Sequence, residues 1–266
     1  MATADQTRPT TSGLPAPPVR KILTLLGAVL VVGLIIAGGF TLIDVAARHS
    51  FDVRSSYAGV QSLVIDDGGG DVVLTSAAAG SRLTIAEHVT RGLVSPRRAA
   101  AFAGGVLRLT TDCRGFDPEC RVRYAVAVPA GTPVTAGSGA GSVTASGLHS
   151  AGIVHLSSGA GDVIATDVSS ATAVALSSGA GDVTATRVGA PRLRLSSGAG
   201  DVTADVTTLI GTLVAHSGAG DVSLSVPDSS YALQASSGAG DVSDSSLRTD
   251  PASPRTISST SGAGDV

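Results

Sequence analysis

Several residue types are absent or scarce in this sequence of 266 residues. It has no Trp and no Asn, only two Cys, and 3% aromatic residues. This composition argues against a core built around large rings, and the lack of Asn excludes N-linked glycosylation, whose acceptor is Asn. Lysine occurs once, at Lys21, and the net charge is −3 without any basic run, which argues against nucleic acid as a partner. The residues present are mainly small, with 34 Gly and an apolar fraction of 43% that consists mostly of Ala, Val and Leu.

The N-terminal part predicts a membrane anchor. Residues 1–21 are rich in Pro, Thr and Ala without apolar periodicity, so we expect a disordered cytoplasmic tail. The uncharged run 22–43 would form a helix of roughly 33 Å, close to the thickness of the bilayer interior. Arg20 and Lys21 directly precede the run, so the positive-inside rule predicts a single-pass protein of the cell membrane with its C-terminal part extracytoplasmic. A cleaved signal peptide ending at residues 45–47 is the alternative, although its apolar stretch is usually only about 7 to 15 residues long.

The strongest signal in the chain is a repeat of about 20 residues. The string S-G-A-G-[D/S]-V recurs, and apolar and polar residues alternate on both sides of it. The copies start at Ser138, Ser158, Ser178, Ser197, Ser217, Ser237 and Ser261. A degenerate copy lies upstream, because residues 63–72 align without a gap onto residues 193–202. Alternation on both sides of a glycine turn predicts strand, turn and strand in every copy.

A unit of this length cannot close a core alone, so the copies must stack. Stacked parallel strands lie about 4.8 Å apart, and each coil covers the apolar row of its neighbour. The sequence therefore predicts an all-β fold, a parallel β-helix-like β-solenoid, preceded by one transmembrane helix. We expect the regular solenoid over residues 137–266, and we place four turn alanines in its interior: Ala160, Ala180, Ala199 and Ala219. The chain stops inside the seventh copy, so we expect either an incomplete last coil or an end capped by a partner.

The repeat also carries an aspartate, and stacking would align these carboxylates in a column. Like charges about 5 Å apart repel by just under 1 kcal/mol in water, so we expect backbone N–H groups freed by the preceding glycine to offset the repulsion. The alternative is a calcium column like that of G-G-x-G-x-D β-rolls, although the spacer residue of that pattern is missing. The calcium candidates are Asp162, Asp182, Asp201, Asp221 and Asp241. From Gly137 onward, 11 Asp stand against 5 Arg, so this part suits cations or basic partners.

Residues 51–136 keep the alternation but lose the motif. We expect irregular strands that begin the solenoid, or a small β layer beside it, with one short helix over residues 94–103. Cys113 and Cys120 flank a turn, and outside the cell such a pair predicts a disulfide that contributes about 2.5 kcal/mol. No C-x-x-C or H-x-x-H accompanies the pair, so a metal site is not expected there.

The sequence contains no G-x-S-x-G or S-x-x-K motif, and we predict no catalytic residue and no cofactor. The enzymatic alternative is a polysaccharide-active β-helical hydrolase or lyase, in which two neighbouring repeat aspartates act as acid and base. Equivalent aspartates give no reason for different roles, and aromatic residues that would stack on sugars are scarce.

The order of these segments resembles a known bacterial family. A single span is followed by the G-G-G-D-V turn of residues 68–72, by the string V-P-A-G-T-P-V of residues 128–134, and by serial S-G-A-G-D-V coils. This arrangement is similar to the "putative adhesin" or toastrack-type family of β-helical cell-envelope proteins, over about residues 55–266. The resemblance implies a surface-exposed solenoid without established catalytic residues. We therefore predict a membrane-anchored, non-enzymatic module for adhesion or envelope scaffolding, whose partners are the lipid bilayer through residues 22–43 and another envelope protein or surface polymer; a calcium-binding surface protein is a further alternative.

Overall fold

The computed structural model describes residues 30, 49–91, 95–112, 121–244 and 247–266. The chain divides into two compact units, Met1–Ala47 and Arg48–Val266, and every strand belongs to the second. Within the described residues, no helix combines the length and the apolar character needed to cross a membrane. Apart from Leu30, the predicted span 22–43 lies outside those residues, so the structure does not test it.

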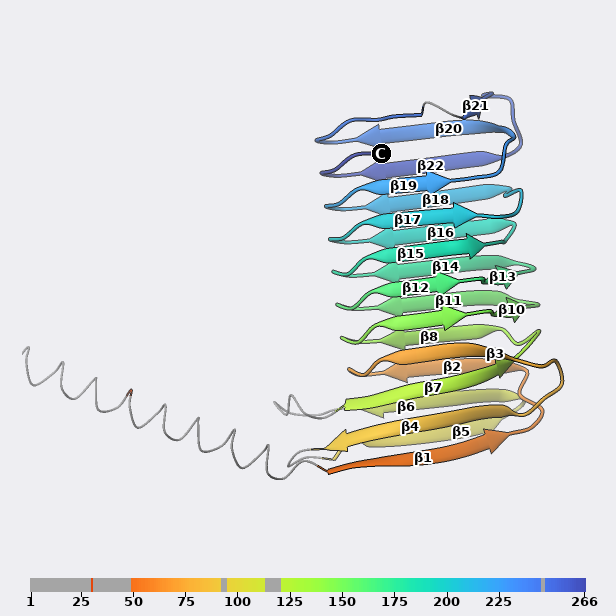
Figure 1. Ribbon diagram of the computed structural model, residues 1–266, viewed down its shortest axis with the longest axis vertical. Coiled ribbons are helices and arrows are strands. Elements are labelled where there is room, and N and C mark those ends of the chain that lie inside the picture. The colour runs from red at the N-terminus through yellow and green to blue at the C-terminus, as the bar shows by residue number, and fades with distance from the viewer. Residues whose placement is uncertain (1–29, 31–48, 92–94, 113–120, 245–246) are drawn as a thin grey trace, which may run out of the picture. The chain divides into compact units, whose positions relative to one another are not determined.

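The second unit is built from two long sheets and one short one (Figure 1). The nine-stranded sheet has the order β1 (His49–Tyr57), β4 (Leu83–Arg91), β7 (Arg121–Pro129), β3 (Val72–Ala77), β9 (Val143–Ser146), β12 (Val163–Thr166), β15 (Val183–Val188), β17 (Val202–Val206) and β19 (Val222–Ser225). The eleven-stranded sheet has the order β21 (Arg248–Thr249), β20 (Ser230–Ser237), β22 (Thr256–Ser261), β18 (Thr212–Ser217), β16 (Arg192–Ser197), β14 (Ala173–Ser178), β11 (Ile153–Ser158), β8 (Val134–Ser138), β2 (Ser62–Asp67), β6 (Val106–Asp112) and β5 (Arg97–Ala103). The short sheet pairs β10 (His149–Ser150) with β13 (Ser169–Ser170).

Stacking in register confirms the all-β, parallel solenoid. In the nine-stranded sheet, Val163 pairs with Val143 on one side and with Val183 on the other. Its side chain is fully buried, as is that of Val154 in the eleven-stranded sheet. The period of two leaves one apolar row on the inner face of each sheet, and the two rows pack against each other as the core.

The turn alanines do not belong to this core. Ala160, Ala180, Ala199 and Ala219 are exposed, contrary to the sequence-based expectation. They lie at the tips of turns in which the serine before each glycine, and not the alanine after it, points inward, as Ser178 does with 7% exposure.

The strands of residues 51–136 join the same two sheets. β2 and β3 form a coil in repeat register, with Leu63 paired to Val134 and Val72 paired to Val143. β6 and β7 form the next layer outward, and beyond them β1, β4 and β5 continue the sheets with antiparallel pairing.

The helix predicted over residues 94–103 is wrong. Arg97–Ala103 form β5, which pairs antiparallel with β6, for example Phe102 with Leu107. The helical preference of alanine is worth less than about 1 kcal/mol per residue, and pairing along an open sheet edge outweighs it.

Chain order and stacking order differ at the far end. The strand β22, which leads into the seventh copy of the repeat, lies between β18 and β20. The backbone confirms this placement, because the Gly262 amide donates to Ser217 O and the Gly238 amide donates to Ser261 O, both at 3.0 Å.

Candidate functional site

The serine that precedes each glycine turn links the turn to the neighbouring coil through hydrogen bonds of its hydroxyl group. The hydroxyl of Ser178 accepts a hydrogen bond from the Gly181 amide at 2.8 Å and donates one to Gly161 O of the neighbouring coil at 2.8 Å. Both backbone groups are thereby satisfied where little water reaches them. The same donation to a neighbouring coil recurs at Ser138, Ser158, Ser197, Ser217, Ser237 and Ser261. Sequence analysis missed this role, although the serine recurs as regularly as the aspartate.

Close backbone approach explains the glycines of the turn. A Cβ placed on Gly179 would lie 2.2 Å from Gly159 O, and one on Gly181 would lie 2.5 Å from Gly161 O. Any side chain at these positions would push adjacent coils apart, so the stack requires glycine there.

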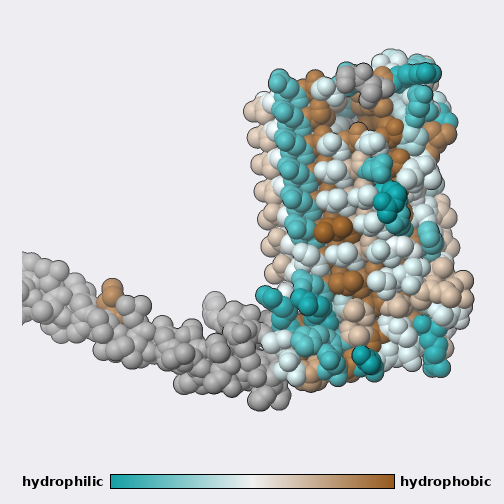
Figure 2. Space-filling view, in the orientation of Figure 1, coloured by the Kyte–Doolittle hydropathy of each residue, from teal (hydrophilic) through white to brown (hydrophobic). Residues whose placement is uncertain are grey.

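The aspartates line up along the edge formed by these turns. Oδ1 of Asp162 accepts the backbone amide of Asp182 at 3.0 Å, and Oδ1 of Asp182 accepts that of Asp201 at 2.9 Å. The series continues through Asp221, Asp265 and Asp241. We call the six residues Asp162, Asp182, Asp201, Asp221, Asp265 and Asp241 the aspartate ladder; Figure 2 shows a column of hydrophilic side chains along this edge.

The expected backbone N–H donors are thus present, but they belong to a different residue from the one predicted. The amide belongs to the aspartate of the next coil and not to a glycine of the same turn. Each carboxylate therefore joins two coils, and the attraction between carboxylate and amide offsets the repulsion along the column. Asp265 lies between Asp221 and Asp241, since β22 is inserted between β18 and β20.

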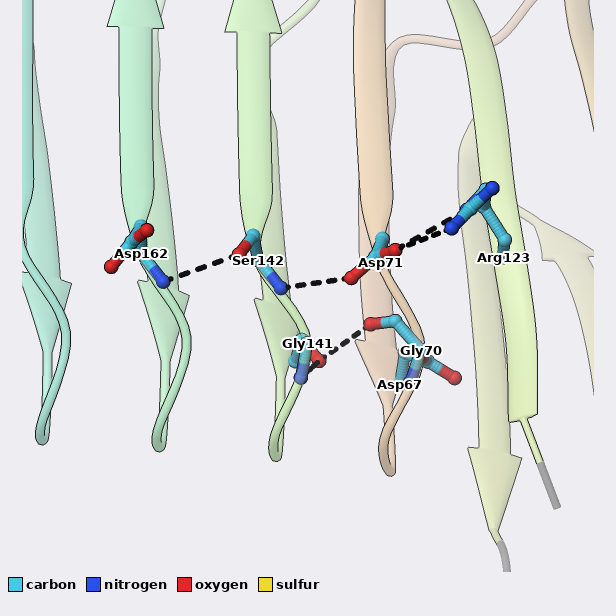
Figure 3. Close-up of polar contacts among 8 residues, drawn as sticks. Asp67, Gly70, Asp71, Arg123, Gly141, Ser142 and Asp162 are labelled. Atoms are coloured by element: carbon cyan, nitrogen blue, oxygen red, sulfur yellow. Dashed lines mark hydrogen bonds and ion pairs between the residues drawn. The ribbon is translucent and has the colours of Figure 1, made fainter. Parts of the chain in front are cut away.

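An arginine closes the ladder at the first coils (Figure 3). Arg123 donates to Asp71 Oδ2 from Nη2 at 2.9 Å and from Nε at 3.2 Å. Asp71 Oδ1 accepts the Ser142 amide, and Ser142 Oγ accepts the Asp162 amide at 3.3 Å. Serine thus replaces aspartate in one coil and continues the same pattern of contacts.

The ladder is exposed. In the described contacts five of its carboxylates accept through Oδ1 alone, and Asp241, at the end of the series, contributes its amide. No group of three or more His, Cys, Asp or Glu within the described residues is arranged to hold a metal ion. The calcium hypothesis for Asp162, Asp182, Asp201, Asp221 and Asp241 therefore gains no support from geometry. Cys113 and Cys120 lie outside the described residues, so their disulfide stays a prediction.

A second polar cluster is buried where β2 meets β6. Asp67 is 1% exposed, its Oδ2 accepts the Gly70 amide at 2.5 Å, and its Oδ1 has no partner. Burial raises the pKa of Asp67 to about 6. Beside it, the Thr111 hydroxyl bonds the Tyr124 hydroxyl at 2.6 Å, and burial raises the pKa of Tyr124 to about 12. The alignment of residues 63–72 onto residues 193–202 could have revealed this site, because it places Asp67 at the position of the buried Ser197.

One open groove lies on the outer face of β1, β3, β4 and β7. It measures about 490 Å³, and Arg54 is its only ionisable lining residue. Its lining includes no residue of the aspartate ladder, so the groove and the ladder are separate features of this part of the chain.

Part of the chain matches a known family model, and several solved structures are similar to it. The family model Toastrack DUF4097 matches residues 130–266. No curated protein matches the chain. Similar solved structures include a putative adhesin from Bacteroides fragilis, with 14% identity and a TM-score of 0.43, and a putative cell adhesion protein from Clostridium sporogenes, with 10% identity and a TM-score of 0.38. Each comparison covers 82% of this chain and 97% of the other. The family match extends over slightly more than half of the sequence, and the chain belongs to the Toastrack DUF4097 family.

Proposed function

We propose that this protein is a non-enzymatic interaction module of the bacterial cell envelope. In this proposal residues 22–43 anchor it in the cell membrane and the solenoid stands on the extracytoplasmic side. The uncharged run and the basic residues directly before it support the anchor and its orientation. The solenoid presents a long surface of repeated coils, which suits an adhesin-like role.

The aspartate ladder is the observation that carries the proposal. It places one exposed carboxylate in each of six successive coils, which lie about 4.8 Å apart, on a scaffold fixed by hydrogen bonds between the coils. A single exposed ion pair is worth at most about 1 kcal/mol. A row of such sites engages a polymer many times over, and multivalency converts weak contacts into firm attachment. The partner that fits is a cationic or cation-carrying surface polymer or a basic envelope protein.

The equivalence of the ladder residues supports a binding role over a catalytic one. Acid and base catalysis by a carboxylate pair requires two different environments, one of which keeps its proton. Asp182 and Asp201 instead make the same contact with the next coil, at 2.9 and 2.8 Å. The polysaccharide-cleaving alternative thus has no pair of carboxylates in distinct surroundings along the ladder.

A charge-matched pair of variants tests the proposal. The ladder variant replaces Asp162, Asp182, Asp201 and Asp221 by Asn, which keeps the Oδ1 acceptor and removes the charge. The control variant replaces Asp205, Asp228, Asp244 and Asp250 by Asn. Both lose the same formal charge, but only the ladder variant neutralises a column of carboxylates.

Capture of envelope polymers and proteins by the full chain in membrane vesicles is the measurement. We expect the ladder variant to lose capture and the control variant to retain it. Equal loss in both would show that net charge alone acts, and retention in both would refute the ladder as the site. Protease digestion of intact cells tests location, because a protected solenoid would contradict an extracytoplasmic one.

A further inference from the structure

Exposed apolar side chains gather at the end of the solenoid formed by β1 and β5. These are the terminal strands of the two long sheets at that end (Figure 1). Phe51 is 40% exposed and Phe102 is 44% exposed. All seven residues of β5 are exposed as well. We call the surface formed by Phe51, Tyr57, Arg98 and Phe102 the basal face.

Contacts between these residues hold the basal face in place. The rings of Tyr57 and Phe102 lie 5.9 Å apart, and the Arg98 guanidinium lies 5.5 Å from the centre of the Phe51 ring. Arg98 Nη1 also donates to Glu87 Oε2 at 2.5 Å, and Glu87 is 8% exposed. The rings cover the end of the core, yet Phe51 and Phe102 stay partly exposed to water, and neighbouring exposed aromatic side chains favour an interaction surface.

The charge of this end is opposite to that of the coils. The strands β1, β4, β5, β6 and β7 contain seven Arg against three carboxylates, a formal charge of +4. From Gly137 onward, 11 Asp against 5 Arg give −6. An anionic surface would therefore attract the basal end and repel the ladder.

We propose that the basal face lies against an anionic phospholipid surface. Aromatic side chains and arginines are the residues that favour the headgroup region, and each arginine near an anionic bilayer contributes about 1 kcal/mol. This orientation of the solenoid rests on the membrane anchor of the proposed function. Only residues 44–48 separate the candidate span from β1, so an anchored span would hold β1 close to the membrane. Contact with lipid would cover Phe51 and Phe102 while the acidic coils point away from the membrane.

The chain has no tryptophan, so a single introduced indole reports on one position alone. The substitution Phe102→Trp places a single indole in the basal face, and Leu209→Trp places one at an equally exposed position, 53% accessible, after β17. The full chain is reconstituted in vesicles that contain brominated phospholipids, with or without phosphatidylglycerol. We expect bromine to quench the fluorescence of F102W in the anionic vesicles and to leave L209W unquenched.

Charge removal gives the expected size of the effect. Arg97→Gln in the F102W background removes about 1 kcal/mol of attraction, so the ratio of quenched to unquenched indole should fall about fivefold in anionic vesicles. Arg97 is exposed at the start of β5. Quenching of F102W that is no greater than that of L209W would overturn the proposal. Protection of F102W from aqueous quenchers without bromine quenching would also overturn it, by assigning the face to a second copy of the chain.

Alkaline carbonate extraction of the same vesicles separates this proposal from the anchor. A chain that resists extraction while F102W stays unquenched is anchored but does not use its basal face. A chain that carbonate releases, with F102W quenched before the release, uses the basal face but lacks the anchor.

Discussion

The substitution Asp67→Ser gives a buried carboxyl position the residue that stands there in most other coils. Asp67 is 1% exposed, and only its Oδ2 has a hydrogen-bond partner, the Gly70 amide. Serine can accept the same amide, as Ser178 accepts that of Gly181. The variant therefore keeps the turn and removes a group that is costly to ionise in place.

The magnitude follows from the pKa of Asp67, which burial raises from 3.8 to about 6. The folded protein keeps the proton of the Asp67 carboxyl to higher pH than the unfolded chain does. The contribution of this protonated carboxyl to the free energy of unfolding is therefore fully present below about pH 4. It is lost as the pH rises to about 6. A shift of about two units corresponds to about 3 kcal/mol. Above pH 7 we expect the free energy of unfolding of Asp67→Ser to exceed that of the wild type by about 2 kcal/mol. The difference is smaller than about 3 kcal/mol because the smaller serine side chain leaves a cavity, which is itself destabilising.

Urea denaturation followed by far-ultraviolet circular dichroism from pH 4 to pH 8 measures this difference. The other carboxyl groups titrate in both proteins, so the difference between the two curves isolates Asp67. The exposed neighbour Asp66 supplies the control. Its charge is the smallest of the causes that raise the pKa of Asp67, so Asp66→Ser should change the pH dependence of the free energy of unfolding far less than Asp67→Ser does. A difference between Asp67→Ser and wild type that stays constant with pH would refute the buried, proton-retaining carboxyl.

Three further outcomes are expected. In urea denaturation, Gly200→Val should lower the free energy of unfolding by about 3 kcal/mol and Ser196→Val by less than about 0.5 kcal/mol. The reason is that a Cβ at Gly200 would lie 2.6 Å from a carbonyl oxygen of the neighbouring coil. Equal losses in the two variants would contradict this close approach of the coils. Ser178→Ala should lower the free energy of unfolding by about 2 kcal/mol, since two backbone groups lose their hydrogen-bond partner. Ser177 faces outward, and Ser177→Ala should be nearly neutral. Equal thermal midpoints for the two variants would contradict the structural role of the Ser178 hydrogen bonds. Excess Ca²⁺ should leave the thermal midpoint where NaCl of matched ionic strength leaves it, and a higher midpoint would assign the aspartate ladder to calcium.

The sequence by itself determined the coil and its register. The 20-residue period, the glycine turn and the alternation around it require strands that stack in line, as Val143, Val163 and Val183 do. The column of aspartates was predictable for the same reason. The partner of each aspartate was not, because the amide that Asp162 accepts belongs to the neighbouring coil. A hydrogen bond between coils cannot be read from the pattern within one coil.

Only the tertiary structure decided which coils are neighbours. Every coil presents nearly the same row of apolar side chains and backbone groups, so β22 fits between β18 and β20 as well as it would at the end of the stack. The same edge pairing made a strand of the alanine-rich segment Arg97–Ala103. Burial of Asp67 likewise depends on β6 lying beside β2, a contact between segments whose order of stacking the repeat does not encode. Local periodicity specifies what a coil is, whereas packing at nearly equivalent edges specifies where each coil lies.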